Sequence, residues 1–496
     1  MKDIWNILRR SSQTAEPALA IGTAEGIAHT QRLVRRAGGS LVGSVAIGPA
    51  AARRWSRPRP LGPAEDLGRI VGEHGISIAY LCLPSVMADL SEQLTRQLRD
   101  LSVQVRSLPT PSDQLNGRCA AWCGPQSADQ LLGRRPHPLD EQAIRRVLED
   151  KTVLITGAGG SIGSQIATLA ATYRPAALLL MDCSENSLFE IDRQLADIPR
   201  LRRLALLHDV TDAARTAELF LAHRPQVVFH AAAHKHVPMM QDHPHQAVRN
   251  NFFGTRSVAD AAHAAGCERF VMISSDKAVH PSSVMGATKR MAELYIQWLA
   301  PQSRTHYSMV RFGNVLGSAC SVIPIWNRQL ARGGPITVTD RRMSRYFMTI
   351  VEAASLVIQS AALTDDRSPL YVLDMGRPVR IVDLAERFIQ MHGLQPGRDV
   401  EVVFTGARPG EKLHEQLAYD DEDMLETAHA SVRQLRTTVP TDDHVQWMLQ
   451  TFTGLLRSGT RNEIFNALHQ AVPAMRKAGD RLPGADTPAP PVRRIA

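Results

Sequence analysis

A glycine-rich turn at residues 156–163 constrains the fold of this chain more than any other feature. The turn reads T-G-A-G-G-S-I-G, follows the apolar run 153–155 and precedes a helical pattern, and a second apolar run ends in Asp182. Its glycines, Gly157, Gly160 and Gly163, let the turn close, let a pyrophosphate approach the backbone and let the helix pack on the strand. Asp182 is placed to accept a hydrogen bond from a ribose 2′-hydroxyl and to repel a 2′-phosphate. The pattern predicts a strand–turn–helix unit that binds a dinucleotide, NAD rather than NADP.

Apolar runs alternate with helical patterns on both sides of this turn. Before it, strands are expected at 18–21, 41–47, 76–83 and 103–108. After it, strands are expected at 153–155, 177–181, 204–207, 227–229 and 270–273. Such alternation is typical of parallel sheets with helices on both faces. We therefore predict an α/β fold, in which a Rossmann-type doubly wound parallel sheet at 151–430 follows a smaller Rossmann-like α/β domain at 17–110.

The other segments have the composition of extensions and connections. Residues 111–150 are predicted to be a Pro- and Gly-rich linker that ends in a connecting helix capped by Asp140. We expect C-terminal helices at 431–477 and a disordered, proline-rich tail at 478–496. Residues 1–16 form a basic amphipathic extension.

Positive charge is concentrated near the N-terminus. The chain has a net charge of +8, and residues 1–60 hold ten Lys or Arg against three acidic residues. Such a segment suits anionic lipid or nucleic acid, but it lacks the interleaved aromatic side chains on which bases would stack. We therefore expect peripheral association with an anionic membrane and no nucleic-acid partner.

No apolar run is long enough to span a membrane, and no signal-peptide core is present, so a cytoplasmic location is predicted. The six cysteines form no C-x-x-C pair and have no histidines at ligand spacing. We expect reduced cysteines and no metal.

The string S-S-D-K-A-V-H-P-S-S-V-M-G-A-T-K-R, residues 274–290, carries the candidate chemistry. Because it follows the apolar run 270–273, its first residues should emerge at the carboxyl end of a strand, where open α/β sheets bind ligands. Asp276 and Lys277 offer a proton donor and a proton acceptor side by side, although a solvated ion pair is the simpler interpretation. Met285 and Lys289 lie four residues apart and should share one helix face.

This string resembles the methionine-bearing branch of the nucleotide-sugar 4,6-dehydratases of bacterial polysaccharide biosynthesis, within the extended short-chain dehydrogenase family. Related dehydrogenases pair a serine or threonine with Y-x-x-x-K, and this chain has Ser275, Met285 and Lys289 there. A thioether has no proton to donate, so Met285 by itself also fits a core methionine. The resemblance implies that Lys277 removes the sugar C5 proton, that Asp276 protonates the departing C6 hydroxyl and that Lys289 holds the nicotinamide ribose. Ser275, Asp276 or a water could take the proton of the C4 hydroxyl.

Further strings, at 230–238, 308–318, 345–349 and 408–412, also resemble the family. The implied cofactor-binding residues are Gly157, Gly160, Ser161, Ile162, Gly163, Asp182, Asp209, Val210, Ala231, Ala232 and Lys289. The implied substrate-binding residues are Lys235, His236, Asn314, Arg345 and Arg408. Two residues depart from the pattern, since Cys320 replaces a usual glycine and His280 a common asparagine.

The resemblance implies an NAD-dependent dehydratase of UDP-N-acetylglucosamine, or of a related UDP-N-acetylhexosamine, that retains the C5 configuration and serves surface-polysaccharide or glycan synthesis. We expect a homo-oligomer that binds a UDP-sugar. Two alternatives stay open. A 4-epimerase would have no use for the Asp276–Lys277 pair, and a non-catalytic nucleotide-binding scaffold would suit Met285, Cys320 and the degenerate glycine turn of the first domain.

Overall fold

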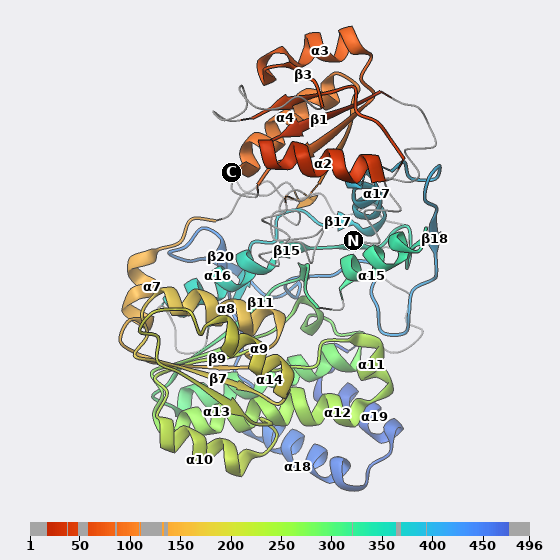
Figure 1. Ribbon diagram of the computed structural model, residues 1–496. Coiled ribbons are helices and arrows are strands. Elements are labelled where there is room, and N and C mark those ends of the chain that lie inside the picture. The colour runs from red at the N-terminus through yellow and green to blue at the C-terminus, as the bar shows by residue number, and fades with distance from the viewer. Residues whose placement is uncertain are drawn as a thin grey trace. The chain divides into compact units, whose positions relative to one another are not determined.

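The computed structural model describes residues 17–36, 38–47, 58–84, 87–108, 110, 131–132, 137–319, 321–363, 369–392 and 394–475. The chain divides into two compact units (Figure 1). Unit 1 consists of residues 1–133, 322–337 and 382–403, and unit 2 of residues 134–321, 338–381 and 404–496. The predicted N-terminal extension, the predicted tail and Cys320 lie outside the described residues.

Unit 1 contains a parallel five-stranded sheet in the order β3-β2-β1-β4-β5. Its strands are β1 (Ala18–Gly22), β2 (Gly43–Ala46), β3 (Pro60–Gly62), β4 (Ile78–Cys82) and β5 (Gln104–Ser107), and its helices include α2 (Ala24–Arg36), α3 (Leu67–His74), α4 (Ala88–Asp100), α15 (Val322–Ala331) and most of α17 (Ile381–Met391). All residues of β1 and β4 are buried, as continuous apolar runs predict. The expected small parallel sheet is confirmed. The sequence did not indicate β3, which is three residues long and begins with a proline.

Unit 2 contains a nine-stranded sheet in the order β19-β20-β16-β11-β10-β9-β6-β7-β8. Its strands are β6 (Thr152–Thr156), β7 (Ala177–Asp182), β8 (Arg203–Leu207), β9 (Val227–His230), β10 (Arg269–Ile273), β11 (His306–Arg311), β16 (Leu370–Leu373), β19 (Met424–Glu426) and β20 (Val432–Leu435). Seven neighbouring strands, from β16 to β8, are parallel, and β20 and β19 add an antiparallel edge. The Rossmann-type sheet predicted from the sequence is confirmed.

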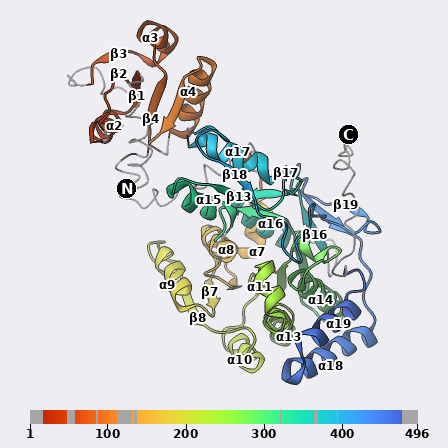
Figure 2. The same cartoon turned by 90° about the vertical axis from the view of Figure 1, so that its right-hand side faces the viewer.

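Helices cover both faces of this sheet (Figures 1 and 2). One face packs on α7 (Glu141–Leu148), α8 (Ser161–Thr172), α9 (Glu185–Gln194) and α16 (Ile350–Ala361), and the other on α10 (Ala213–His223), α13 (Gly254–Ala265) and α14 (Val284–Leu299). Successive residues of a strand point to opposite faces of the sheet. Val153 and Ile155 belong to the apolar cluster on the α8 face, and Leu154 belongs to the cluster on the α13 face. The predicted cap of the connecting helix is confirmed, because the Asp140 side chain accepts a hydrogen bond from the Ala143 amide at the start of α7.

The prediction that residues 431–477 are helical is wrong at its start. Strand β20 lies there and pairs antiparallel with β16. Among the described residues beyond it, α18 (Asp442–Ser458) and α19 (Arg461–Ala471) are helical. The run V-R-Q-L has apolar residues three apart, which suits a helix as well as a strand, so periodicity over four residues could not decide.

The other elements are short. They are α11 (Val237–Asp242), α12 (Pro244–Ala247), the π-helical turn η3 (Val248–Phe253), the 3-10 turns η1 (Ala64–Asp66), η4 (Asp276–Ala278) and η5 (Ala300–Gln302), and the strands β12 (Asn314–Leu316), β13 (Ile336–Val338), β14 (Ser344–Arg345), β15 (Phe347–Thr349), β17 (Val379–Arg380) and β18 (Val402–Phe404). None of the helices in the described ranges combines the length and the apolar composition that crossing a bilayer requires.

A buried histidine joins the centre of the unit 2 sheet to the helices on one face. His230, the last residue of β9, bonds through Nδ1 to Thr156 Oγ1 at 2.7 Å and through Nε2 to Thr255 Oγ1 at 2.9 Å. Burial, with a smaller effect of the Lys289 charge, lowers the pKa of His230 to about 3. The imidazole is therefore neutral in the folded protein at physiological pH.

Acid should weaken the fold through this residue. Below pH 6.5 the unfolded chain protonates His230 while the folded chain does not, so stability falls as the pH drops from 6.5 towards 3, by up to about 1.4 kcal/mol per pH unit for one group. Urea unfolding at pH 7 and pH 5 should show a smaller loss for His230→Gln than for the wild type. His243→Gln, which changes an exposed histidine, is the control. Equal losses in the wild type and His230→Gln would contradict the assignment.

Candidate active site

The candidate site lies at the carboxyl end of β10. The chain still follows β11 after the strand ends, because the Ser274 amide donates to Val310 O at 2.8 Å and the Asp276 amide to Phe312 O at 3.0 Å. It then turns through η4, where the Ser275 side chain caps the turn by accepting from the Lys277 amide. Asp276 and Lys277 therefore occupy one short turn held at the sheet edge.

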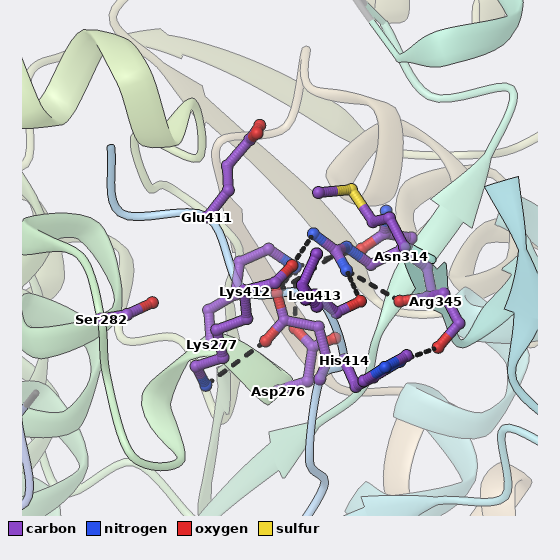
Figure 3. Close-up of polar contacts among 12 residues, drawn as sticks. Asp276, Lys277, Ser282, Asn314, Arg345, Glu411, Lys412, Leu413 and His414 are labelled. Carbon is purple, nitrogen blue, oxygen red and sulfur yellow. Dashed lines mark hydrogen bonds and ion pairs between the residues drawn. The ribbon is translucent and has the colours of Figure 1, made fainter. Parts of the chain in front are cut away.

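Asp276 and Lys277 form a buried ion pair. Lys277 Nζ donates to Asp276 Oδ1 at 3.0 Å and to Asn314 Oδ1 at 3.1 Å (Figure 3). Ser275 Oγ donates to the same Asp276 oxygen at 2.8 Å. The Asp276 side chain has no exposed surface, and 21% of the Lys277 side chain is exposed. The interpretation as a solvated ion pair is therefore wrong, and Lys277 is the member of the pair that solvent reaches.

The second carboxylate oxygen of Asp276 packs against Gly313. Asp276 Oδ2 is buried and has no hydrogen-bond partner among the described residues. A Cβ atom at Gly313 would lie 3.2 Å from this oxygen and 2.9 Å from Tyr346 Cβ. The Asp276 carboxylate therefore packs directly against the backbone of Gly313, where there is no room for a side chain.

Helix α14 carries Met285 and Lys289 on one face, as the sequence predicted. Met285 is 3% exposed and belongs to an apolar cluster with Val284 and Met291. Burial lowers the pKa of Lys289 to about 8, against the opposing charge of Glu293. The helix therefore presents a buried, weakly acidic ammonium group, and the position of the usual tyrosine holds an apolar side chain.

A buried charge network fixes this helix to the sheet. Arg311 on β11 donates to both carboxylate oxygens of Glu293 on α14, at 2.9 and 2.8 Å, and to Glu422 Oε2 at 2.7 Å. Ser274 Oγ, just after β10, donates to Glu293 Oε1 at 2.6 Å. Burial by itself would raise the pKa of Glu293, but Arg311, with Arg290 and the Ser274 hydroxyl, lowers it to about 2. Sequence reasoning missed this network, since no local pattern marks its charges as buried.

A second segment, residues 408–417, closes on the same turn. Lys412 Nζ donates to Val279 O at 2.6 Å, and the Arg345 guanidinium donates to Leu413 O at 3.1 Å and Lys412 O at 2.7 Å (Figure 3). Glu415 Oε1 lies 3.8 Å from Lys277 Nζ. The sequence indicated this segment through its R-P-G-E-K string, but Lys412 and Glu415 were not proposed as site residues.

The predicted substrate-binding residues fall into three groups. Asn314 and Arg345 lie beside Lys277 and the 412–413 backbone. Lys235 Nζ donates to Ala319 O at 2.9 Å, and the Ala319 amide donates to Ser161 Oγ at 2.9 Å, so Lys235 reaches the loop that contacts the glycine turn. His236 precedes α11 and Arg408 is exposed. Their contacts with substrate stay predictions.

The predicted cofactor residues gather at one sheet edge, because β6, β7, β8 and β9 are parallel and the residues follow their carboxyl ends. These residues are the glycine turn with Ser161 and Ile162 at the start of α8, Asp182, Asp209 with Val210, and Ala231 with Ala232.

The geometry of the glycine turn fits a dinucleotide. Gly157 has φ +63°, and a Cβ there would lie 2.7 Å from the Ala232 amide nitrogen. A Cβ at Gly163 would lie 2.1 Å from Gly157 O, so the helix packs directly on the turn. Gly160, the residue before α8, has no side chain that could cap the helix. The Asp182 carboxylate accepts a hydrogen bond from the Gly159 amide at 2.9 Å. Within the described ranges, no cluster of three or more histidine, cysteine or acidic side chains could hold a metal ion.

The chain resembles proteins of polysaccharide biosynthesis. The model of a family described as "Polysaccharide biosynthesis protein" matches residues 153–437. The "Probable polysaccharide biosynthesis protein EpsC" of Bacillus subtilis is 44% identical over 367 residues, which are 73% of this chain, and this chain spans 61% of that relative's length. A Campylobacter jejuni "UDP-N-acetylglucosamine 4,6-dehydratase (inverting)" is 30% identical over 281 residues, covering 55% of this chain and 79% of the relative.

Among solved structures, "X-ray structure of Pen from Bacillus thuringiensis" matches with 31% identity and a TM-score of 0.54, and covers 60% of this chain and 89% of that one.

Removing Arg311 should destabilise the protein strongly. Arg311→Met leaves the buried Glu293 carboxylate without its main partner, which costs about 3 to 5 kcal/mol. Arg436→Met removes one partner of an ion pair whose side chains are over 70% exposed and should change stability little. Urea unfolding of both variants measures the difference, and equal effects would show that the Glu293–Arg311 pair is not a structural anchor.

Proposed function

The chain belongs to the polysaccharide biosynthesis protein family, and from this premise we propose that it is an NAD-dependent 4,6-dehydratase of UDP-N-acetylglucosamine or a related UDP-N-acetylhexosamine. The product would be the UDP-4-keto-6-deoxy sugar, a precursor for surface polysaccharide or glycan. The observation that carries the proposal is the buried Asp276–Lys277 pair at the carboxyl end of β10, with the lysine partly exposed.

A 4,6-dehydration needs a base and an acid on neighbouring carbons. Once C4 is a ketone, the C5 proton is acidic, and Lys277 accepts it through its neutral amine. The C6 hydroxyl leaves as water with the proton that Asp276 received from the C4 hydroxyl, and Lys277 returns its proton to C5 when C6 is reduced. The 3.0 Å hydrogen bond between Lys277 Nζ and Asp276 Oδ1 gives the two groups a route for proton exchange, so one turn can serve both carbons.

The dinucleotide would be held by the glycine turn, Asp182, the residues after β8 and β9, and Lys289. When bound, NAD supplies the oxidation at C4 and the reduction at C6. Lys289 keeps positive charge beside the site, which favours an alkoxide as it develops. Its pKa of about 8 means that a large part of the population carries this charge at neutral pH.

The proton of the C4 hydroxyl needs a route that does not involve Met285. The Ser275 hydroxyl lies 2.8 Å from Asp276 Oδ1, and this supports a path from the substrate through Ser275 to Asp276. Met285 packs in the apolar core and has no exchangeable proton.

The same pair argues against the two alternatives. A 4-epimerase has no need of an acid and a base at C6 and C5. A non-catalytic scaffold would have no use for a buried carboxylate paired with a lysine that solvent reaches.

Purified protein incubated with UDP-N-acetylglucosamine should form a 4-keto-6-deoxy product, detected by mass spectrometry and NMR. Lys277→Met should lower kcat by about 10²- to 10⁴-fold because proton transfer is lost, while NAD released from the denatured protein stays at the wild-type ratio. Met285→Leu conserves core volume and should retain most activity. A C4 epimer as sole product, or full activity in Lys277→Met, would refute the proposal.

A further inference from the structure

We propose that Glu415 is a positioning residue for Lys277, holding the lysine amine between two buried carboxylates and so setting the pH range in which it accepts a proton. The inference deepens the proposed dehydratase function and rests on it. Glu415 Oε1 lies 3.8 Å from the Lys277 amine, and we expect Glu415 to act through the lysine.

The geometry gives Lys277 a carboxylate from each of two segments. Asp276 Oδ1, on η4, is 3.0 Å from the amine, and Glu415 Oε1, on the segment that follows β18, is 3.8 Å from it. The Glu415 side chain is 3% exposed and the Asp276 side chain is fully buried. Because both carboxylates are buried, water screens their charges less than it would on the protein surface.

Glu415 also separates Lys277 from other cations. Lys412 Nζ lies 3.4 Å from Glu415 Oε2, and Arg345 Nε lies 3.8 Å from Glu415 Oε1. The charged groups that face Lys277 are therefore Asp276 from η4, Glu415 and Lys412 from the 408–417 segment, and Arg345 from β14, and Asn314 from β12 contributes a neutral acceptor. Without the Glu415 charge, Lys277 would face one carboxylate and two cations.

These charges set the pH above which Lys277 is a neutral amine and can accept a proton. Burial by itself would lower the pKa of Lys277, but Asp276 and Glu415 outweigh burial and the Arg345 charge and raise it. The resting amine is thus an ammonium group at neutral pH, and it accepts the C5 proton only after losing one of its own. A neutral residue at 415 should shift this deprotonation to lower pH and make the amine a weaker base, which slows the step at high pH.

Glu415 is one of several contacts that hold its segment in place. Lys412 also donates to Val279 O, and Arg345 to the carbonyls of Lys412 and Leu413. Glu415→Gln keeps the side-chain shape and removes only the charge. The variant therefore isolates the electrostatic role.

The first test does not depend on turnover. In protein labelled with ¹³C-lysine, the Cε signal of Lys277, assigned by its absence in Lys277→Met, is titrated in the wild type and in Glu415→Gln. We expect the midpoint of Glu415→Gln to lie about 1 to 3 pH units lower. In Glu415→Asp it should lie close to the wild-type value, and Asp423→Asn, which removes an exposed carboxylate, should leave it unchanged. Equal midpoints in the wild type and Glu415→Gln would overturn the inference.

The second test is the pH profile of kcat for 4-keto product formation. The midpoint of the rise in rate should shift down in Glu415→Gln by as much as the NMR midpoint, with a lower plateau, and Glu415→Asp should restore it. An unshifted profile beside a shifted titration would show that Lys277 is not the base in the rate-limiting step, which also overturns the positioning role. A wild type that forms no 4-keto product would refute the proposed function, and the titration would still show whether Glu415 controls Lys277.

Discussion

The buried Glu293–Arg311 pair is the interaction on which the site depends. It joins α14 to β11. Glu293 also accepts a hydrogen bond from Ser274, the residue that follows β10. Burying two charges is expensive, and the cost is offset here because Arg311 binds two carboxylates and Glu293 accepts from an arginine fork and a hydroxyl. As a result, the helix that carries Lys289 and the turn that carries Lys277 are held to the same two strands.

Burial distinguishes the Asp276–Lys277 pair from an ordinary Asp-Lys dipeptide on the protein surface. On the surface, water would screen the two charges and leave each near its usual ionisation. At the sheet edge, Asp276 is enclosed by Gly313 and the η4 turn, and its charge acts directly on Lys277. Segment 408–417, which lies far along the sequence, adds a second carboxylate and two cations. The proposed chemistry therefore depends on the position of a distant segment as much as on the motif itself.

Much of the architecture could be predicted from the sequence, and the exceptions have physical causes. The long apolar runs and the glycine turn located β1, β2, β4 and β5 of the first sheet and β6 to β10 of the second, because their signals are local. Strand β20 was missed because a run of four residues is too short to distinguish the periodicity of a helix from that of a strand. His280 stands where the resemblance expects an asparagine, and its backbone φ is +37°. Asparagine adopts this region more readily than most residues, so the backbone conformation explains why an asparagine is expected there. Arg311 and Glu415 could not be found, since their roles come from long-range burial.

We propose that the Asp276–Lys277 turn removes a proton from C5 of a UDP-N-acetylhexosamine. Turnover of UDP-N-acetylglucosamine in heavy water, followed by NMR of the product, tests it most directly. A base that exchanges its proton with solvent must place deuterium at C5 of a 4-keto-6-deoxy sugar, with the C5 configuration retained. A 4-keto-6-deoxy product that keeps its original hydrogen at C5, or a product altered only at C4, would show that this turn does not act as the proposed base.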